Sequence, residues 1–188
     1  MAGKGAIWER VCNNSRDRLR QDGDLSWCRM HPPILKIGPG IAKKKGSFLA
    51  VRTGSGPPDW IALHNGLSIL GDDKDCKSKA WRSTNLKKHQ AKAFDYHEKQ
   101  GGVACVLLRM HDKSRWVIPW RILKPLWQKN ATLTLNRLND IGAIRWAFKC
   151  SDEPAYDWLT PLLKWVDKTG EENGRPERQD DSRLDEIS

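Results

Sequence analysis

The chain has 188 residues, enough for one domain with a sizeable core, and carries a formal net charge of +10. Its longest apolar run, Val103 to Leu108, is too short to cross a membrane, and we expect no secretory signal and a reducing, cytoplasmic location. The five cysteines are odd in number and form no Cys-x-x-Cys pair, which excludes the usual pattern of a disulfide framework or a zinc site.

The positive charge is concentrated in the body of the chain. Residues 1–168 carry 30 basic and 16 acidic side chains, whereas residues 169–188 carry three basic and seven acidic ones. A body with a net charge of +14 favours a polyanionic partner, although a merely soluble basic surface would show the same excess. We expect residues 1–168 to form one domain and residues 169–188 to be a disordered acidic tail.

The first elements are a helix and an irregular basic segment. An imperfect 3.6-residue apolar stripe predicts a helix over residues 5–21, with Glu9 in its first turn. Residues 31–57 are rich in proline and glycine and hold the run Lys43-Lys44-Lys45 between short extended pieces. This composition predicts a protruding basic arm, with a flexible surface loop as the alternative.

The remaining elements alternate between strands and helices. The turn signal Asn65-Gly66 joins two strands into a hairpin, and Gly101-Gly102 ends a helix. This order predicts an α/β fold with a mixed central sheet flanked by helices. Strands are expected at 60–63, 67–77, 103–108, 115–119, 132–135 and 143–148, and helices at 86–100, 122–129 and 156–166.

The strand expected over residues 67–77 carries several carboxylates and a lysine. Its two-residue period puts Asp73, Asp75 and Lys77 on one face, and the hairpin is expected to bring Asp59 level with Asp75. Carboxylate oxygens hold a hard cation, and a lysine can orient or activate water beside a phosphate. The pattern indicates a magnesium-dependent phosphodiesterase, and its alternative is a charged turn over residues 72–75.

The ten tryptophans allow two interpretations, base stacking or core packing. Trp60 and Trp81 flank the acidic strand, and we expect them nearest to DNA. Five others fall on apolar faces and are expected in the core: Trp8, Trp116, Trp127, Trp146 and Trp158.

Taken in order, these motifs resemble the RecU-type Holliday junction resolvases of the PD-(D/E)xK nuclease superfamily. The acidic-x-Lys motif has Asp where many members have Glu, and two prolines precede Asp59. The resemblance runs over most of residues 5–168. Its motifs are Gly5-x-x-x-Glu9, Pro58-Asp59-Trp60, Asp73-x-Asp75-Cys76-Lys77, Leu86 to Gln90, Gly101-Gly102 with the apolar run after it, and Tyr156-Asp157-Trp158-Leu159.

The resemblance implies a restriction-endonuclease-like fold in which residues 31–57 form a stalk-like arm. It also implies the roles of individual residues. These are Glu9, Asp59 and Asp75 as metal-binding carboxylates, the backbone carbonyl of Cys76 as a further ligand, Lys77 as the catalytic lysine and Gln90 as a supporting residue near the scissile phosphate. The expected DNA-binding residues are Lys43, Lys44, Lys45, Arg52, Lys87 and Lys88.

The function implied by this resemblance is a homodimeric endonuclease for four-way DNA junctions. It would use Mg²⁺, with Mn²⁺ as a substitute, and cut by paired symmetric nicks in recombination and repair, in a bacterial cell or a phage-infected host. Two alternatives stay open. Another nuclease of the superfamily would cut linear duplex equally well, and a non-catalytic junction-binding protein would bind without cutting.

Overall fold

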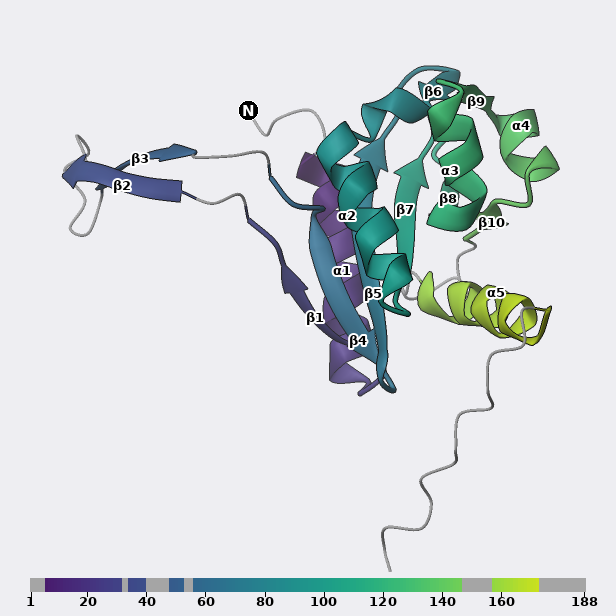
Figure 1. The fold of residues 1–188 in the computed structure, drawn as a ribbon, viewed down its shortest axis with the longest axis horizontal. Coiled ribbons are helices and arrows are strands. Elements are labelled where there is room, and N and C mark those ends of the chain that lie inside the picture. The colour runs from purple at the N-terminus through teal and green to yellow at the C-terminus, as the bar shows by residue number, and fades with distance from the viewer. Residues whose placement is uncertain (1–5, 32–33, 40–47, 53–55, 147–156, 173–188) are drawn as a thin grey trace, which may run out of the picture.

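The computed structural model describes residues 6–31, 34–39, 48–52, 56–146 and 157–172. A six-stranded mixed sheet forms the centre of the molecule (Figure 1). Strands β5 and β7 run parallel, and every other neighbouring pair in this sheet is antiparallel. The strands, in their order across the sheet, are β1 (Ser26–Arg29), β4 (Trp60–His64), β5 (Leu67–Asp75), β7 (Val103–Arg109), β8 (Arg115–Pro119) and β10 (Ile144–Arg145).

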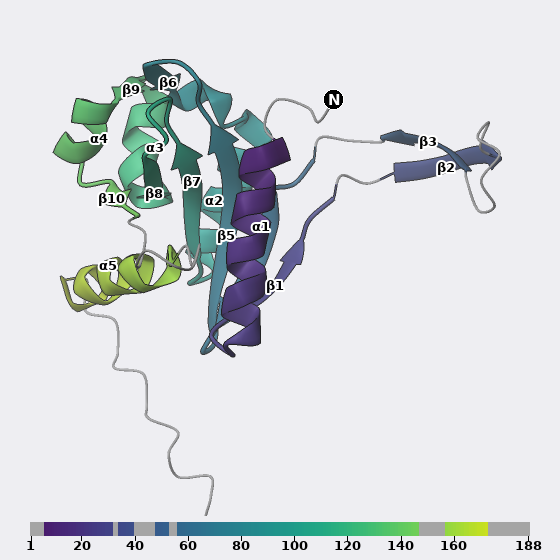
Figure 2. The same ribbon diagram turned by 180° about the vertical axis from the view of Figure 1, so that it is seen from behind.

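Helices cover both faces of this sheet (Figures 1 and 2). On one face α1 (Ala6–Gln21) and α5 (Leu159–Glu172) pack on a core that includes Trp8 and Trp158. On the other face α2 (Lys88–Lys99) and α3 (Trp120–Gln128) pack on a second core that includes Phe94. Because β5 and β7 are parallel, the chain must cross over between them, and α2 lies in that crossover.

Smaller elements complete the fold. β2 (Ile34–Pro39) and β3 (Phe48–Arg52) form a two-stranded antiparallel hairpin. This hairpin stands away from the sheet in both views (Figures 1 and 2), where the sequence predicts the protruding arm. The other short elements are β6 (Ala80–Arg82), which pairs with β9 (Thr132–Thr134), the 3₁₀ helix η1 (Ser83–Asn85) and α4 (Leu135–Asp140).

The predicted mixed α/β sandwich is confirmed, with differences at particular elements. β1, β6, η1 and α4 were not predicted, because each is too short to show a hydrophobic period. The predicted strand over residues 143–148 is β10 up to Arg145, and residues 147 and 148 lie outside the described part. α5 continues to Glu172, so a helix includes the first residues of the expected acidic tail, and residues 173–188 lie outside the described part.

The tryptophans pack in the cores, including two that were expected near DNA. Trp60 is wholly buried and Trp81 is 2% exposed, so neither ring is available for base stacking. Trp60 lies against Gly71 of the neighbouring strand, and its ring centroid is 5.1 Å from that of Trp158. Strand period explains this burial, because the residue after Asp59 points to the opposite face of the sheet.

Among the described residues, no helix combines the length and apolar character needed to cross a lipid bilayer.

The contact between Trp60 and Gly71 gives a test of the core. A methyl group at Gly71 would overlap the buried indole, so we expect Gly71→Ala to lower the free energy of unfolding by about 1–3 kcal/mol. Thermal unfolding measures this loss as a fall in melting temperature of several degrees. Ser68→Ala, in the same strand but half-buried, serves as the control and should stay close to wild type. A Gly71→Ala protein that melts with the wild type would contradict the packing.

Candidate active site

Strand β5 ends in a run of charged residues whose side chains alternate between the two faces of the sheet. Asp73 contacts Arg16 of α1, so it points to the α1 face. Asp72 contacts Gln90 of α2, so it points to the α2 face, and Lys74 forms an ion pair with it there. Asp73 and Asp75 therefore share one face of β5, as expected, but α1 covers that face.

The register of the hairpin decides which acidic residue lies beside Asp59. Trp60 pairs with Gly71, which puts Asp59 level with Asp72. The backbone N–H of Asp73 donates to Asp59 Oδ2 at 2.8 Å. The expectation that Asp59 lies level with Asp75 is therefore wrong. The structure brings Asp59, Asp72 and Lys74 together at the carboxyl end of β5.

Asp72 is the most deeply buried carboxylate of this group. Its side chain is wholly inaccessible to solvent and contacts Lys74 Nζ through Oδ1. Gln90 Nε2 donates to Asp72 Oδ2. The amide oxygen of Gln90 accepts a 3.0 Å hydrogen bond from the backbone N–H of Lys87, which fixes the side chain in the first turn of α2.

Burial makes these two carboxylates costly to ionise. It raises the pKa of Asp72 to about 7, with Lys74 acting in the opposite direction and the charge of Asp59 adding to the rise. Burial also raises the pKa of Asp59, against the hydrogen bond from the N–H of Asp73. Two poorly solvated carboxylates that face one another are stabilised by a cation between or beside them.

The donor set fits a hard divalent cation that keeps part of its hydration shell. No cluster of three or more His, Cys, Asp or Glu side chains suited to a metal occurs in the described ranges. Mg²⁺ does not need such a cluster, because it is commonly held by one or two carboxylates with water and substrate phosphate as further ligands. Asp59 and Asp72 could supply the two carboxylates.

The other residues of the expected metal site lie elsewhere. Asp75 is held by Arg109, which donates to its two carboxylate oxygens at 2.9 and 2.8 Å. The N–H of Cys76 donates to the backbone oxygen of Arg109. Lys77 is exposed and follows the end of β5, so it does not share a face of that strand with Asp73 and Asp75. Glu9 is half-exposed and forms an ion pair with Arg29 of β1.

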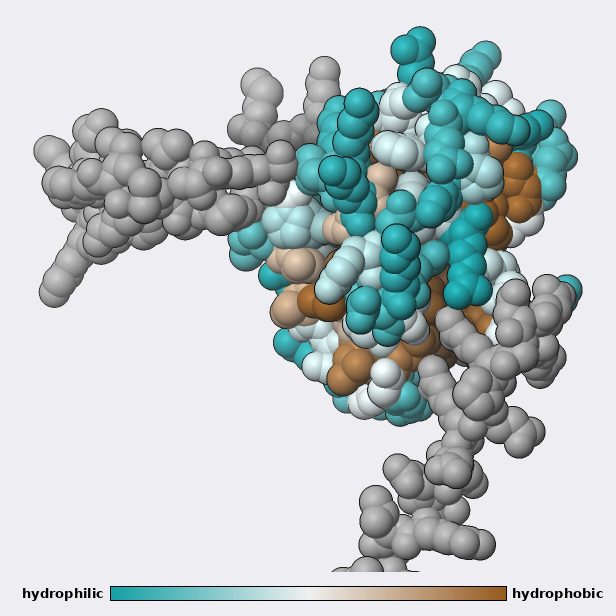
Figure 3. All heavy atoms as spheres, in the orientation of Figure 1, coloured by the Kyte–Doolittle hydropathy of each residue, from teal (hydrophilic) through white to brown (hydrophobic). Residues whose placement is uncertain are grey.

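The expected DNA-binding residues are only partly described. Lys87 and Lys88 are exposed at the start of α2, next to Gln90. Figure 3 shows hydrophilic side chains over the α2 side of the molecule. Arg52 is the last residue of β3, and Lys43, Lys44 and Lys45 lie outside the described residues.

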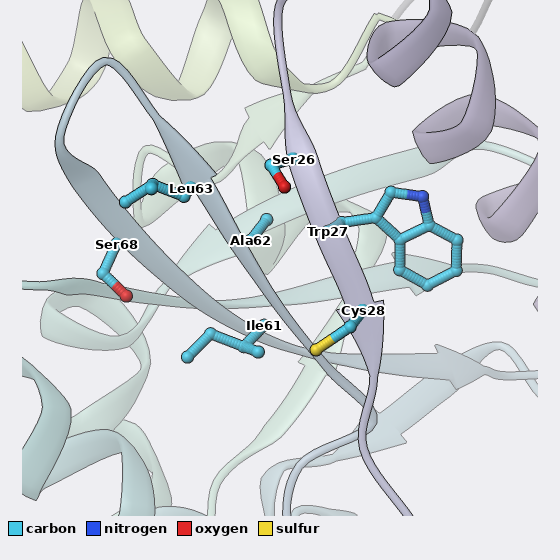
Figure 4. A pocket seen from close by; sticks show the side chains of 7 residues that line it. All are labelled: Ser26, Trp27, Cys28, Ile61, Ala62, Leu63 and Ser68. Carbon is cyan, nitrogen blue, oxygen red and sulfur yellow. The ribbon is translucent and has the colours of Figure 1, made fainter.

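A surface groove of about 330 Å³ lies apart from these charged residues. Figure 4 shows that its lining comes from β1, β4 and β5. The side chains around it are small or apolar and include no carboxylate, lysine or histidine, so it has no groups suited to phosphodiester hydrolysis. The lining residues are Ser26, Trp27, Cys28, Ile61, Ala62, Leu63 and Ser68.

The sequence did contain the signal for Asp72 and Lys74. Asp72-x-Lys74 is itself an acidic-x-Lys pattern, and one glycine separates it from the apolar residues Ile69 and Leu70. Counting outward from the turn would have found it, because Asp59 is six residues before Asn65 and Asp72 is six residues after Gly66. A two-residue hairpin pairs residues that are equally distant from its turn.

The structure thus has a mixed sheet between helices, with two carboxylates and a lysine at the carboxyl end of β5. The sequence matches the RecU family, recombination protein U, over residues 4–151. The chain belongs to this family, whose members are Holliday junction resolvases, and is thus a nuclease that resolves Holliday junctions.

One similar solved structure is Archaeoglobus fulgidus Hjc, a Holliday junction resolvase from an archaeal hyperthermophile. Its sequence identity is 14% and its TM-score is 0.46. The match covers 73% of this chain and 94% of the Archaeoglobus chain. No curated protein matches the sequence significantly.

The raised pKa of Asp72 predicts a pH-dependent stability of the metal-free protein. An unfolded Asp ionises near pH 4, whereas the folded Asp72 carboxyl keeps its proton up to about pH 7. The contribution of the protonated form is therefore complete below pH 4 and is lost as the pH rises to 7. Asp72→Asn cannot ionise, so we expect its stability relative to wild type to increase between pH 5 and 7, by about 1 kcal/mol or more.

Urea unfolding in EDTA at several pH values measures this difference. Asp95→Asn is the matched control, because the partners Lys124 and Trp120 keep the pKa of Asp95 below its usual range. That control should show no trend between pH 5 and 7. A pH-independent difference between Asp72→Asn and wild type would contradict the prediction.

Proposed function

We propose that Asp59, Asp72 and Lys74 form a metal-dependent centre with which the protein cuts four-way DNA junctions. The observation that carries this proposal is the position of Asp59, level with Asp72 and hydrogen-bonded to the N–H of Asp73. The set expected from sequence, with Asp75 and Lys77 in place of Asp72 and Lys74, has less support. Its carboxylate is already paired with Arg109 and its lysine lies past the end of the strand.

In this proposal Asp59 and Asp72 hold Mg²⁺, for which Mn²⁺ can substitute. The bound cation would polarise the scissile phosphate and lower the pKa of a water molecule. Lys74, 20% exposed beside Asp72, would position the attacking water and balance negative charge on the phosphate. Gln90 would keep Asp72 in one orientation, because its own amide is fixed by the N–H of Lys87.

Glu9 keeps a place in the proposal as a carboxylate that approaches from α1. Its ion-pair partner Arg29 lies opposite Trp60 in the sheet, one residue from Asp59. This ion pair is half-exposed, so it contributes little stability and can be exchanged for another partner at low cost. The backbone carbonyl of Cys76 would be a metal ligand only in the alternative set with Asp75 and Lys77.

The proposed substrate geometry requires two copies of this centre. A four-way junction has approximate two-fold symmetry and is resolved only when two strands are cut. A homodimer with two-fold symmetry would present two equivalent centres and make paired symmetric nicks. The exposed residues Lys87 and Lys88 would bind phosphates near the cut, and the β2–β3 hairpin would enter the junction. We place this activity in the cytoplasm of a bacterial cell or a phage-infected host.

Two lysines three residues apart provide the sharpest test of the centre. Lys74→Gln and Lys77→Gln make the same chemical change on either side of Asp75. We expect Lys74→Gln to cut a labelled four-way junction about 100-fold more slowly or worse, as for loss of a group that positions or activates water. Lys77→Gln should cut at close to the wild-type rate. Single-turnover cleavage in Mg²⁺, with EDTA as the blank, makes the comparison.

The matched carboxylate pair extends this test. Asp72→Asn should abolish cutting, and Asp75→Asn should retain more of it. Junction binding in EDTA should survive in all four variants, which separates loss of chemistry from loss of fold. Greater loss at Lys77 and Asp75 than at Lys74 and Asp72 would restore the set expected from sequence. Equal cutting of linear duplex by the wild type would argue against junction selectivity.

A further inference from the structure

We propose that Arg16 and Asp73 are positioning residues for the catalytic centre. This buried ion pair behind the sheet would fix the stretch of β5 that carries Asp72 and Lys74 and the backbone N–H that holds Asp59. The inference rests on the proposed function above, because it assigns a task to residues that lie behind the proposed metal ligands.

The pair is bidentate and almost completely removed from solvent. Arg16 Nη1 and Nη2 donate to the two carboxylate oxygens of Asp73 at 3.1 and 2.8 Å. The side chains are 1% and 4% exposed. Two planar groups joined by two parallel hydrogen bonds permit very little rotation about either side chain.

Further contacts hold each partner of the pair. Trp60 Nε1 donates to Asp73 Oδ1 at 2.8 Å, and Arg16 Nη2 also donates to Asn13 Oδ1 at 2.7 Å. The Arg16 guanidinium carbon lies 4.8 Å from a ring centroid of Trp27 and 4.8 Å from one of Trp60. The cation therefore has aromatic partners as well as a carboxylate. Asp73 is held from α1 and from β4 at the same time.

Asp73 is also in direct contact with the proposed centre. Its backbone N–H donates to Asp59 Oδ2, and its two chain neighbours are Asp72 and Lys74. Trp60, which holds the Asp73 carboxylate, is the chain neighbour of Asp59. A shift of the Asp73 backbone would therefore move all three proposed catalytic side chains. Stability alone does not account for the pair, because apolar residues of similar volume generally stabilise a core at least as well.

A second arginine holds the strand two residues further on. Arg109 of β7 forms a bidentate pair with Asp75, and its guanidinium carbon lies 5.3 Å from a ring centroid of Trp8. The backbone positions on both sides of Lys74 are therefore fixed from the α1 face. Within residues 72–75, the side chains of Asp72 and Lys74 face the proposed centre, and each has a chain neighbour that an arginine holds.

The substitution Arg16→Lys tests the geometry without changing the charge. Lysine keeps the positive charge near Asp73 but cannot form the planar two-pronged contact. We expect Mn²⁺ to bind Arg16→Lys about 10-fold more weakly or worse, measured by calorimetry on the full chain. Single-turnover junction cutting at saturating metal should also slow, because Lys74 is displaced as well. Asp73→Asn, which keeps a side-chain oxygen for Trp60, should show both effects.

Asp95→Asn is the matched control for these variants. Asp95 also accepts a 2.8 Å hydrogen bond from a tryptophan, Trp120, and pairs with a cation, Lys124, but it lies on α2 away from the proposed centre. This variant should bind Mn²⁺ with wild-type affinity and cut at the wild-type rate. If the loss of any Asp contact with a tryptophan and a cation weakened Mn²⁺ binding or slowed cutting, this control would show the same change.

The outcomes separate the inference from the proposed function. Folded Arg16→Lys and Asp73→Asn proteins with wild-type Mn²⁺ affinity and cutting would overturn the inference and leave the function intact. A wild type that neither binds Mn²⁺ more tightly than Asp59→Asn nor cuts junctions would overturn the proposed function and, with it, this inference. If a single variant fails to fold, the apolar double variant Arg16→Met with Asp73→Leu decides. We expect it to fold and to show the same losses, and wild-type behaviour would overturn the inference.

Discussion

The two-residue turn at Asn65 and Gly66 determines which residues of β4 face which residues of β5. Both residues have positive φ, 44° and 75°, which is the backbone conformation of the hairpin turns that fit twisted strands. His64 pairs with Leu67 directly after the turn, and each further pair follows in register up to Trp60 and Gly71. A shift by one residue would exchange the faces of every side chain on β4. Asp59 lies level with Asp72 because a two-residue turn pairs residues that are equally distant from it.

The absence of a side chain at Gly71 makes that register compatible with a packed core. Trp60 occupies the space that a Cβ atom at position 71 would need, and its indole N–H reaches forward along β5 to Asp73. One aromatic residue thus joins the apolar core to the charged end of the strand. The indole N–H of a buried tryptophan usually has a hydrogen-bond partner, and for Trp60 that partner is Asp73. Core packing and the position of the proposed centre depend on the same contact.

The carboxylates at the end of β5 fall into two groups with different partners. Those on the α1 face, Asp73 and Asp75, are neutralised by arginines that are themselves packed against tryptophans. Those on the α2 face, Asp59 and Asp72, have one lysine near them and pKa values raised by burial. A buried charge without a full partner is costly, which favours the binding of a cation at this point and nowhere else among these four residues. The negative charge that these two buried carboxylates would carry thus agrees with the metal dependence that we propose.

The sequence by itself determined the class of fold, the hairpin and the family. Strand and helix periods, Asn65-Gly66, and the order of short motifs are local properties, and the mixed sheet and the RecU family agree with them. Asp59 and Gln90, two residues of the proposed centre, were also named from the sequence, because one follows a proline before a strand and the other lies in the first turn of a helix. These features depend on residues that are close together along the chain.

The tertiary structure decided which acidic residues of β5 are already paired with arginines. Asp72-x-Lys74 and Asp75-x-Lys77 show the same acidic-x-Lys pattern and follow one another directly, so local propensity does not distinguish them. The hairpin register puts Asp59 level with Asp72, and the tertiary structure adds that Arg16 and Arg109, distant in sequence, pair with Asp73 and Asp75 behind the sheet. The burial of Trp60 and Trp81 also depends on segments that are distant in sequence. Which side of a strand is covered depends on helices contributed by other parts of the chain, and a period of two shows the alternation without showing which face is open.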